Sequence, residues 1–256
     1  MESIIVGGGE IGLSLAKRLR AGGASVLIHD IRPEVDELKD VGHLIKDINF
    51  LHICIPYRSD FVMIIGKYIE RFNPKITIIE STVPVGTTRK LMNTGKQIVH
   101  SPVRGRHKQT LSEHIGKFMK PVGSDNKATA ERVVQYYKQA GIPAKHMGPP
   151  ETTELGKLFE LGYYGLCIAW HQEMQRWCDR TGVDFNKAFT EWNLDYNKVY
   201  GASNETKHLC KATLFPGHIS GHCVMQNIPK LQKVMASEFI RTILHSNDKW
   251  AKEHGT

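Results

Sequence analysis

The sequence predicts an α/β fold in which a doubly wound parallel sheet is followed by an all-helical domain. Short apolar runs alternate with segments of helical spacing over residues 1–148, a pattern typical of βαβ units. After a Gly-Pro-Pro break at residues 148–150 the alternation stops, and apolar residues recur at helical spacing over residues 152–180. We therefore expect an α/β domain over residues 1–148 and a helical domain over residues 149–256.

The composition is that of a globular protein. Apolar residues make up 41% and charged residues 23% of the 256 positions, and no apolar run approaches the ~20 residues of a membrane helix. The first residues lead directly into an apolar strand without a signal-peptide pattern, so we expect a cytoplasmic protein without a membrane partner. The five cysteines are scattered without a CxxC pair, which favours reduced thiols over a disulfide framework.

The formal net charge of +8 is spread along the chain and forms no basic stripe or tail. An acidic small-molecule substrate agrees with this sign as well as a nucleic acid does. A merely solvated basic surface explains most of the individual charges. Because the charge forms no stripe or tail, we expect no nucleic-acid partner.

A glycine-rich turn follows the first apolar run. Gly7, Gly9 and Gly12 fit the pattern G-x-G-x-x-G, with an amphipathic helix after it. The first glycine of this pattern permits a tight turn, the second lets a diphosphate approach the main chain, and the third lets the helix pack closely on the strand. Unpaired N–H groups at the helix N-terminus favour phosphate. The turn, including Glu10 and Ile11, therefore predicts a dinucleotide site in a Rossmann domain.

Asp30 lies 21 residues after Gly9, at the end of the second apolar run. A carboxylate there accepts hydrogen bonds from the ribose hydroxyls of NAD and repels the 2′-phosphate of NADP, so NAD is the expected cofactor. Arg32, two residues further on, leaves that preference open.

Three more apolar runs, at residues 50–55, 76–79 and 97–99, end in polar segments. Ligands of open α/β sheets bind at the carboxyl ends of the strands, so we expect chemistry at residues 56–58, 80–88 and 100–107.

Residues 80–88, ESTVPVGTT, resemble a stretch of the nucleotide-sugar dehydrogenases that act on UDP-glucose and GDP-mannose. In that family the stretch lines the nicotinamide and sugar region, which implies that Ser81 and Thr82 bind the cofactor and that Thr82 is also an active-site residue. Pro56, at the end of the preceding strand, is a further expected cofactor contact.

Two more stretches carry the same resemblance. ETTELGKLFE, residues 151–160, is similar to the start of the family's central helix, and Lys157 takes the place of its active-site lysine. PGHISGHCVMQN, residues 216–227, resembles the loop with the catalytic cysteine, and Cys223 takes that place. In that family the alcohol is oxidised to an aldehyde, the thiol adds to it, a second hydride transfer leaves a thioester, and water releases the acid.

A thiolate is needed for this chemistry. We expect His222 and a helix starting at Val224 to lower the pKa of the Cys223 thiol.

The sequence also departs from that family. It ends before the family's third domain, which holds the nucleotide of the substrate, and Leu161 and Asn227 replace an asparagine and an aspartate. The four-electron reaction is therefore in question, although Asn227 remains a candidate for substrate binding.

Residues 101–107, SPVRGRH, resemble the substrate loop of β-hydroxyacid and 6-phosphogluconate dehydrogenases. The resemblance implies that Ser101 holds a carboxylate, and Arg104 and Arg106 can clamp a carboxylate or phosphate with paired N–H bonds. We therefore expect a small anionic substrate, with His107 as another contact and His100 and His107 as candidate proton carriers.

Three functions stay open: an NAD-dependent dehydrogenase of an acidic, sugar-like alcohol, a two-electron β-hydroxyacid dehydrogenase with an inert Cys223, and a dinucleotide-binding regulator without catalysis. We expect no metal, because His218, His222 and Cys223 have no partner cluster. The long helix is apolar on more than one face, which suits an interdomain spine or a dimer interface, and GYYG at residues 162–165 would permit close helix approach; we expect a homodimer.

Overall fold

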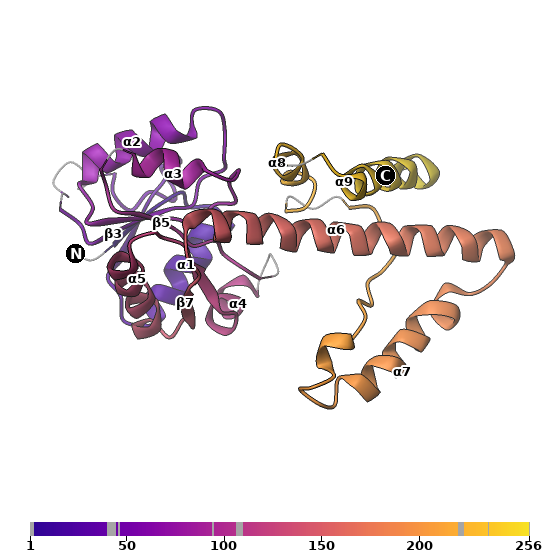
Figure 1. Ribbon diagram of the computed structural model, residues 1–256. Coiled ribbons are helices and arrows are strands. Elements are labelled where there is room, and N and C mark those ends of the chain that lie inside the picture. Colours follow the sequence, from indigo (N-terminus) through magenta and orange to yellow (C-terminus); the bar gives the residue numbers. More distant parts are fainter. Residues whose placement is uncertain are drawn as a thin grey trace. The chain divides into compact units, whose positions relative to one another are not determined.

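The structure is a computed structural model that describes residues 3–39, 45, 47–93, 95–105, 110–219, 223–234 and 236–255. The chain divides into two compact units, Met1–Lys157 and Leu158–Thr256, and the division falls inside the long helix α6 (Figure 1). The predicted fold class, a Rossmann-type α/β domain followed by helices, is confirmed.

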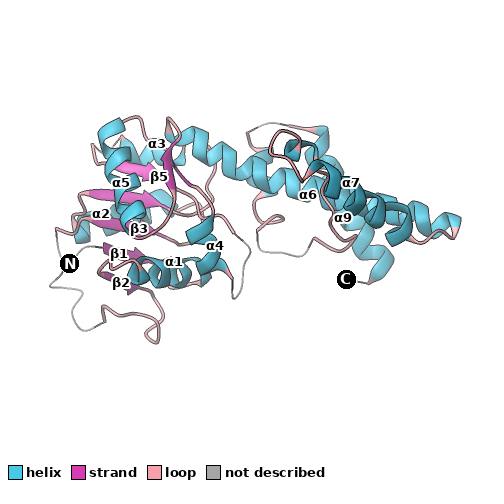
Figure 2. Ribbon diagram, turned by 90° about the horizontal axis from the view of Figure 1, so that it is seen from below, coloured by secondary structure: helices cyan, strands magenta, loops and turns pink. Residues whose placement is uncertain are grey.

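The first unit contains, in chain order, β1 (Ser3–Val6), α1 (Glu10–Ala21), β2 (Val26–His29), β3 (Phe50–Ile53), α2 (Phe61–Phe72), β4 (Ile76–Ile79), α3 (Thr87–Met92), β5 (Ile98–His100), α4 (Leu111–Lys117), β6 (Lys120–Val122), α5 (Lys127–Gln139) and β7 (Ala144–His146). Five of these strands form one parallel sheet in the order β2-β1-β3-β4-β5 (Figure 2). The strands β6 and β7 form a small parallel pair, which a bridge between His100 and Gly123 joins to β5. All carboxyl ends of the main sheet therefore lie along one edge.

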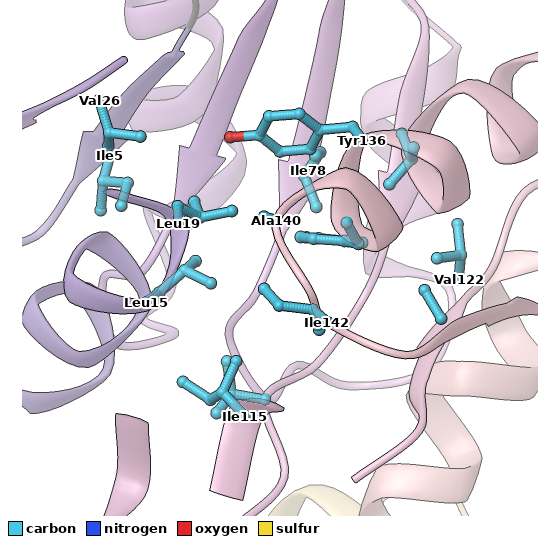
Figure 3. Packing of buried hydrophobic residues seen from close by; sticks show 14 of the residues in the cluster. Ile5, Leu15, Leu19, Val26, Ile78, Ile115, Val122, Tyr136, Ala140 and Ile142 are labelled. Carbon is cyan, nitrogen blue, oxygen red and sulfur yellow. The ribbon is translucent and has the colours of Figure 1, made fainter. Parts of the chain in front are cut away.

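Both faces of the main sheet are covered. Alternate strand residues point to opposite faces, so Ile5 and Ile78 join one core with residues of α1, α4 and α5, while Ile4 and Ile79 join a second core with α2 and α3. Figure 3 shows the first of these cores. Near-continuous apolar strands are required because neither face meets water.

Arg20 and Glu37 provide hydrogen-bond partners for main-chain groups on the free edge of β2. The amide of Ile28 donates to Glu37 Oε2 at 2.8 Å and its carbonyl accepts from the amide of Glu37 at 2.9 Å. Arg20 Nη2 donates to the carbonyl of Val26 at 2.8 Å. These bonds occupy main-chain groups that an exposed edge strand would offer to another chain.

The second unit contains the rest of α6 (Pro150–Thr181), a π-helical turn (Asn186–Thr190), α7 (Glu191–Tyr200), a 3₁₀ turn (Lys207–Leu209), α8 (Ile228–Gln232) and α9 (Glu238–His254). Two glycines of α6 allow close packing. A Cβ at Gly162 would lie 3.0 Å from Leu231 of α8, and one at Gly165 would lie 3.0 Å from Val224. Among the described residues, none of the helices is both long enough and apolar enough to cross a bilayer.

Candidate active site

The glycine turn between β1 and α1 has the geometry of a diphosphate cradle. Gly7 has a φ of +102°, and a Cβ at Gly12 would lie 1.9 Å from the carbonyl oxygen of Gly7, so both positions require glycine. Gly9 precedes the first residue of α1, and a Cβ built there meets no atom within 4 Å. The turn therefore leaves open space in front of the N-terminus of α1, and these residues fit a dinucleotide phosphate. Glu10 and Ile11 form the first turn of that helix.

Asp30 follows β2 and lies beside this turn. Its Oδ2 atom accepts a hydrogen bond from the amide of Gly8 at 2.5 Å, and 9% of its side chain is exposed. The expected ribose acid and the expected phosphate cradle are thus adjacent. Pro56, exposed, follows the carboxyl end of β3.

The strand β3 ends at Ile53, earlier than the predicted residue 55. The hydroxyl of Ser81 lies next to this end, 2.6 Å from the carbonyl oxygen of Ile55 and 3.1 Å from that of Ile53, and its hydrogen is shared between them. Ser81 therefore fixes the main chain after β3, and the neighbouring Thr82 is half-buried.

The loop that follows β4 is attached to the first turns of α6. The carboxylate of Glu154 is completely buried. It accepts hydrogen bonds from the amides of Gly86 at 2.6 Å and Thr88 at 2.8 Å. Burial raises the pKa of Glu154, although the two amides oppose that effect. Lys157 lies three residues after Glu154 on the same helix and is half-buried, so these bonds fix the helix that carries it against the loop that carries Thr82.

His100, a candidate proton carrier, is completely buried at the end of β5. Its Nε2 lies 3.2 Å from the carbonyl oxygen of Ser81, which can only accept, and its Nδ1 lies 2.7 Å from the hydroxyl of Thr153 on α6. Burial lowers the pKa of His100 to about 3, and the positive charges of Lys120 and Lys157 act in the same direction. His100 is therefore a neutral group that fixes the start of α6 to β5.

The expected substrate loop follows His100. Ser101 is completely buried, and its carbonyl accepts a hydrogen bond from Lys120 Nζ at 2.8 Å. Arg104 is half-buried, with its guanidinium carbon 5.3 Å from the ring centre of Phe118. Arg106 and His107 lie outside the described residues.

Cys223 belongs to the second unit and is half-buried. Asn227 Nδ2 donates to the carbonyl of Cys223 at 2.5 Å, while Asn227 Oδ1 accepts from Lys230 Nζ at 2.5 Å. Burial lowers the pKa of Lys230. His222 lies outside the described residues.

The prediction that a helix starts at Val224 is wrong. Residues 223–227 form a turn, and α8 begins at Ile228. The reason is Pro229, whose fixed φ suits the first turn of a helix and whose missing N–H leaves no bond to an earlier turn. The dipole of α8 therefore begins five residues after Cys223.

The segment before Cys223 is held by a buried polar network of α6 and α9. Asn247 Oδ1 accepts the amide of Ile219 at 2.7 Å, and Gln172 Nε2 donates to the carbonyl of Gly217 at 2.8 Å. Ser246 joins the two helices by donating to Gln172 Oε1 at 2.7 Å. The first residues of the cysteine loop are thus fixed by polar side chains that are themselves buried.

Sequence reasoning missed Glu154, Thr153, Gln172 and Asn247. Glu154 lies inside the ETTELGK motif one turn before Lys157, so helical spacing could have indicated it. Gln172 and Asn247 have no such signal, because their partners are 45 and 28 residues away in the sequence.

No family model matches the chain. In sequence the chain is 28% identical over 200 residues to UDP-N-acetyl-D-mannosamine dehydrogenase of Methanococcus vannielii, which covers 76% of this chain and 43% of that protein. The enzyme of the same name from Methanococcus maripaludis strain C7 is 28% identical over 178 residues, 68% of this chain and 38% of its own length. The chain therefore spans less than half of the curated relatives that it matches.

Solved structures show the same fold. UDP-D-ManNAc dehydrogenase of Pyrococcus horikoshii superposes with a TM-score of 0.79 at 21% identity, over 99% of this chain and 69% of that chain. 3-Hydroxyisobutyrate dehydrogenase of Mycobacterium tuberculosis superposes with a TM-score of 0.72 at 13% identity, over 100% of this chain and 94% of that chain. The resemblance that the motifs indicated is thus confirmed: the chain is similar in sequence to UDP-N-acetyl-D-mannosamine dehydrogenases over less than half of their length.

Proposed function

We propose that this chain is an NAD-dependent dehydrogenase that oxidises a hydroxyl group of a small, acidic, sugar-like substrate. The glycine turn carries the proposal: its packing requires glycine at positions 7 and 12, whereas the space at Gly9 is open. Asp30 beside the turn supplies the acid that such a site uses for a ribose. The names of the sequence relatives support a dehydrogenase acting on a sugar derivative.

In this proposal the chain's own residues bind the reactants and move one proton. Lys157 accepts the proton of the substrate hydroxyl, and the buried bonds of Glu154 and Thr153 fix the helix that carries it. Thr82 and Arg104 orient the substrate, Arg104 by pairing with its negative charge. NAD, when bound, accepts the hydride.

A second candidate is the two-electron reaction with an inert Cys223. The side chain at position 227 favours it, because Asn227 brings an amide in place of a carboxylate and is hydrogen-bonded to Cys223 and Lys230. A water that must attack a thioester would find no general base at that position. In the four-electron reaction Cys223 is instead the nucleophile.

One assay tests both candidates. Absorbance at 340 nm is followed with NAD and a panel of UDP-sugars, sugar acids and β-hydroxyacids, and the NADH formed is counted against the substrate consumed. One NADH per substrate supports the two-electron reaction, and two support the four-electron reaction. No reduction of NAD with any compound would contradict both and favour a regulator that binds a dinucleotide.

The cradle has its own test. The variant Gly9→Val is expected to fold normally, because its Cβ meets no atom and its φ of −73° suits any residue, yet to weaken NAD binding at least ~10-fold by filling the phosphate space. Gly66→Ala on α2, where a Cβ also meets no atom, is the matched control. Titration calorimetry measures both, and unchanged binding in Gly9→Val would remove the cradle from the proposal.

Exposed aromatic side chains of the second unit support the proposal of a homodimer. Four large aromatic side chains on one face of α6 are half or more exposed: Phe159, Tyr163, Trp170 and Trp177. Their spacing of 4, 7 and 7 residues places them within about 40° of one line along the helix. Exposure of such an apolar stripe to water is unfavourable, and a two-fold dimer buries it against the same stripe of a second copy.

Light scattering behind size-exclusion chromatography tests the dimer. We expect twice the mass of one chain for the wild type and the mass of one chain for Trp170→Glu, because a charge at the centre of the stripe cannot be buried without a partner. Trp192→Glu on α7, where the tryptophan is 76% exposed outside the stripe, is the control. A wild type of single-chain mass would contradict the dimer.

A further inference from the structure

Asp30 and Arg32 form a fixed ion pair beside the glycine turn. Arg32 donates to Asp30 Oδ1 from its amide and from Nε, both at 2.9 Å, and its Nη2 lies 3.3 Å from Oδ2. The same Nη2 donates to the carbonyl of Gly8 at 2.9 Å, while the amide of Gly8 donates to Asp30 Oδ2 at 2.5 Å. The guanidinium therefore bridges the ribose acid and the phosphate cradle.

This pairing changes what Asp30 presents to a ligand. An ionised carboxylate has about four lone-pair sites, and four donor contacts already reach the two oxygens of Asp30. The hydrogen bond from Arg32 is the main reason that the pKa of Asp30 is lowered to about 2, so the acid stays ionised and paired. The pair as a whole has no net charge, and the repulsion by which such an acid excludes a 2′-phosphate is cancelled.

The guanidinium is also accessible. Half of the Arg32 side chain is exposed, against 9% for Asp30, so a ligand arriving from solvent meets the cation more readily than the acid. A guanidinium binds phosphate through paired, charge-assisted N–H bonds. Gly8 is hydrogen-bonded to both members of the pair, and its position requires glycine, because a Cβ there would lie 2.3 Å from Val35 of the loop after β2.

We propose that Arg32 is the residue that sets dinucleotide preference, and that through it the chain binds NADP as well as NAD. The proposal rests on the proposed function, because it places the adenosine ribose at the Asp30 end of the glycine turn. It goes beyond that function in assigning the 2′-phosphate a partner on this chain.

Calorimetric titration with NAD and with NADP tests the proposal without a substrate. For the wild type we expect the two dissociation constants to lie within about 10-fold of each other. Arg32→Gln should weaken NADP binding at least ~10-fold and leave NAD binding unchanged or tighter, because NADP loses a charge partner while the oxygens of Asp30 become free for the ribose hydroxyls. Arg32→Lys keeps the charge and should retain most of the NADP affinity.

Two further variants separate the ion pair from general effects on the fold. Asp30→Asn removes the acid but leaves Arg32, so NADP should bind more tightly than NAD. Arg20→Gln is the matched control, since Arg20 also bonds to a carbonyl and an acid, namely Val26 and Glu37, and not to Asp30. It should change the two affinities by the same factor.

The outcomes distinguish this inference from the proposed function. A wild type that binds NAD and not NADP would overturn the inference alone, and so would an Arg32→Gln variant that loses both dinucleotides equally. A wild type that binds neither dinucleotide would overturn the proposed function, and the role of Arg32 with it.

Discussion

Replacement of Lys157 by methionine is expected to lower turnover by at least ~100-fold, the smaller end of what a general base contributes. Methionine keeps the unbranched stem and removes the amine. The buried bonds of Glu154 to Gly86 and Thr88 do not involve the Lys157 side chain, so the helix start should stay in place.

Two controls make this result specific. The dissociation constant of NAD, measured by calorimetry, should change by less than about 2-fold, because the glycine turn is untouched. Lys138→Met on α5, where the lysine is exposed, should leave turnover unchanged. Turnover of Lys157→Met close to that of the wild type would remove this lysine from the mechanism.

The largest effect on stability is expected at the buried cluster around Glu80, at the carboxyl end of β4. This carboxylate is 1% exposed and contacts Lys120 Nζ at 2.5 Å, His52 Nδ1 at 2.8 Å and the hydroxyl of Tyr137 at 2.7 Å. Burial alone would raise its pKa, but the ammonium of Lys120 and the ring of His52 outweigh burial, and the pKa of Glu80 is about 2.

Lys120→Met should lower the free energy of unfolding by about 3–5 kcal/mol near neutral pH, because it leaves the Glu80 carboxylate buried without its cation. Urea denaturation measures this loss. The double variant Glu80→Gln with Lys120→Met should be more stable than Lys120→Met alone, since no buried charge remains. Lys117→Met is the control: its pair with Glu113 is about 70% exposed on both sides, so a change within about 1 kcal/mol is expected.

The pH dependence gives an independent check. The pKa of Glu80 in the folded chain lies below its ordinary value of 4.5, so its stabilising contribution is complete above pH 4.5 and is lost as the pH falls toward about 2. In Lys120→Met the burial that raises the pKa of Glu80 is less opposed, so we expect this carboxyl to be protonated more easily. The difference in unfolding free energy between wild type and Lys120→Met should therefore shrink as the pH falls, and a difference independent of pH would contradict this account.

The local order of residues determined the main features of the first unit. The glycine spacing, the apolar run before it and the acid after the next run predict the turn at residues 7–12 and Asp30 beside it, because each requirement acts within one βαβ unit. The long helix after residue 150 follows from apolar periodicity in the same way. The motif residues Thr82, Lys157 and Cys223 were found by resemblance, and their roles remain proposals.

Only the tertiary structure decided how these pieces are fixed. Glu80 and Lys120 lie 40 residues apart, and Glu154 lies 66 residues from Thr88; no local pattern relates them. The structure also pairs Asp30 with Arg32, although the sequence left the effect of Arg32 open, and it starts α8 at Ile228 and not at Val224. A sequence determines periodicity and turn chemistry locally, whereas the partner of a buried charge depends on which strands and helices the whole fold brings together.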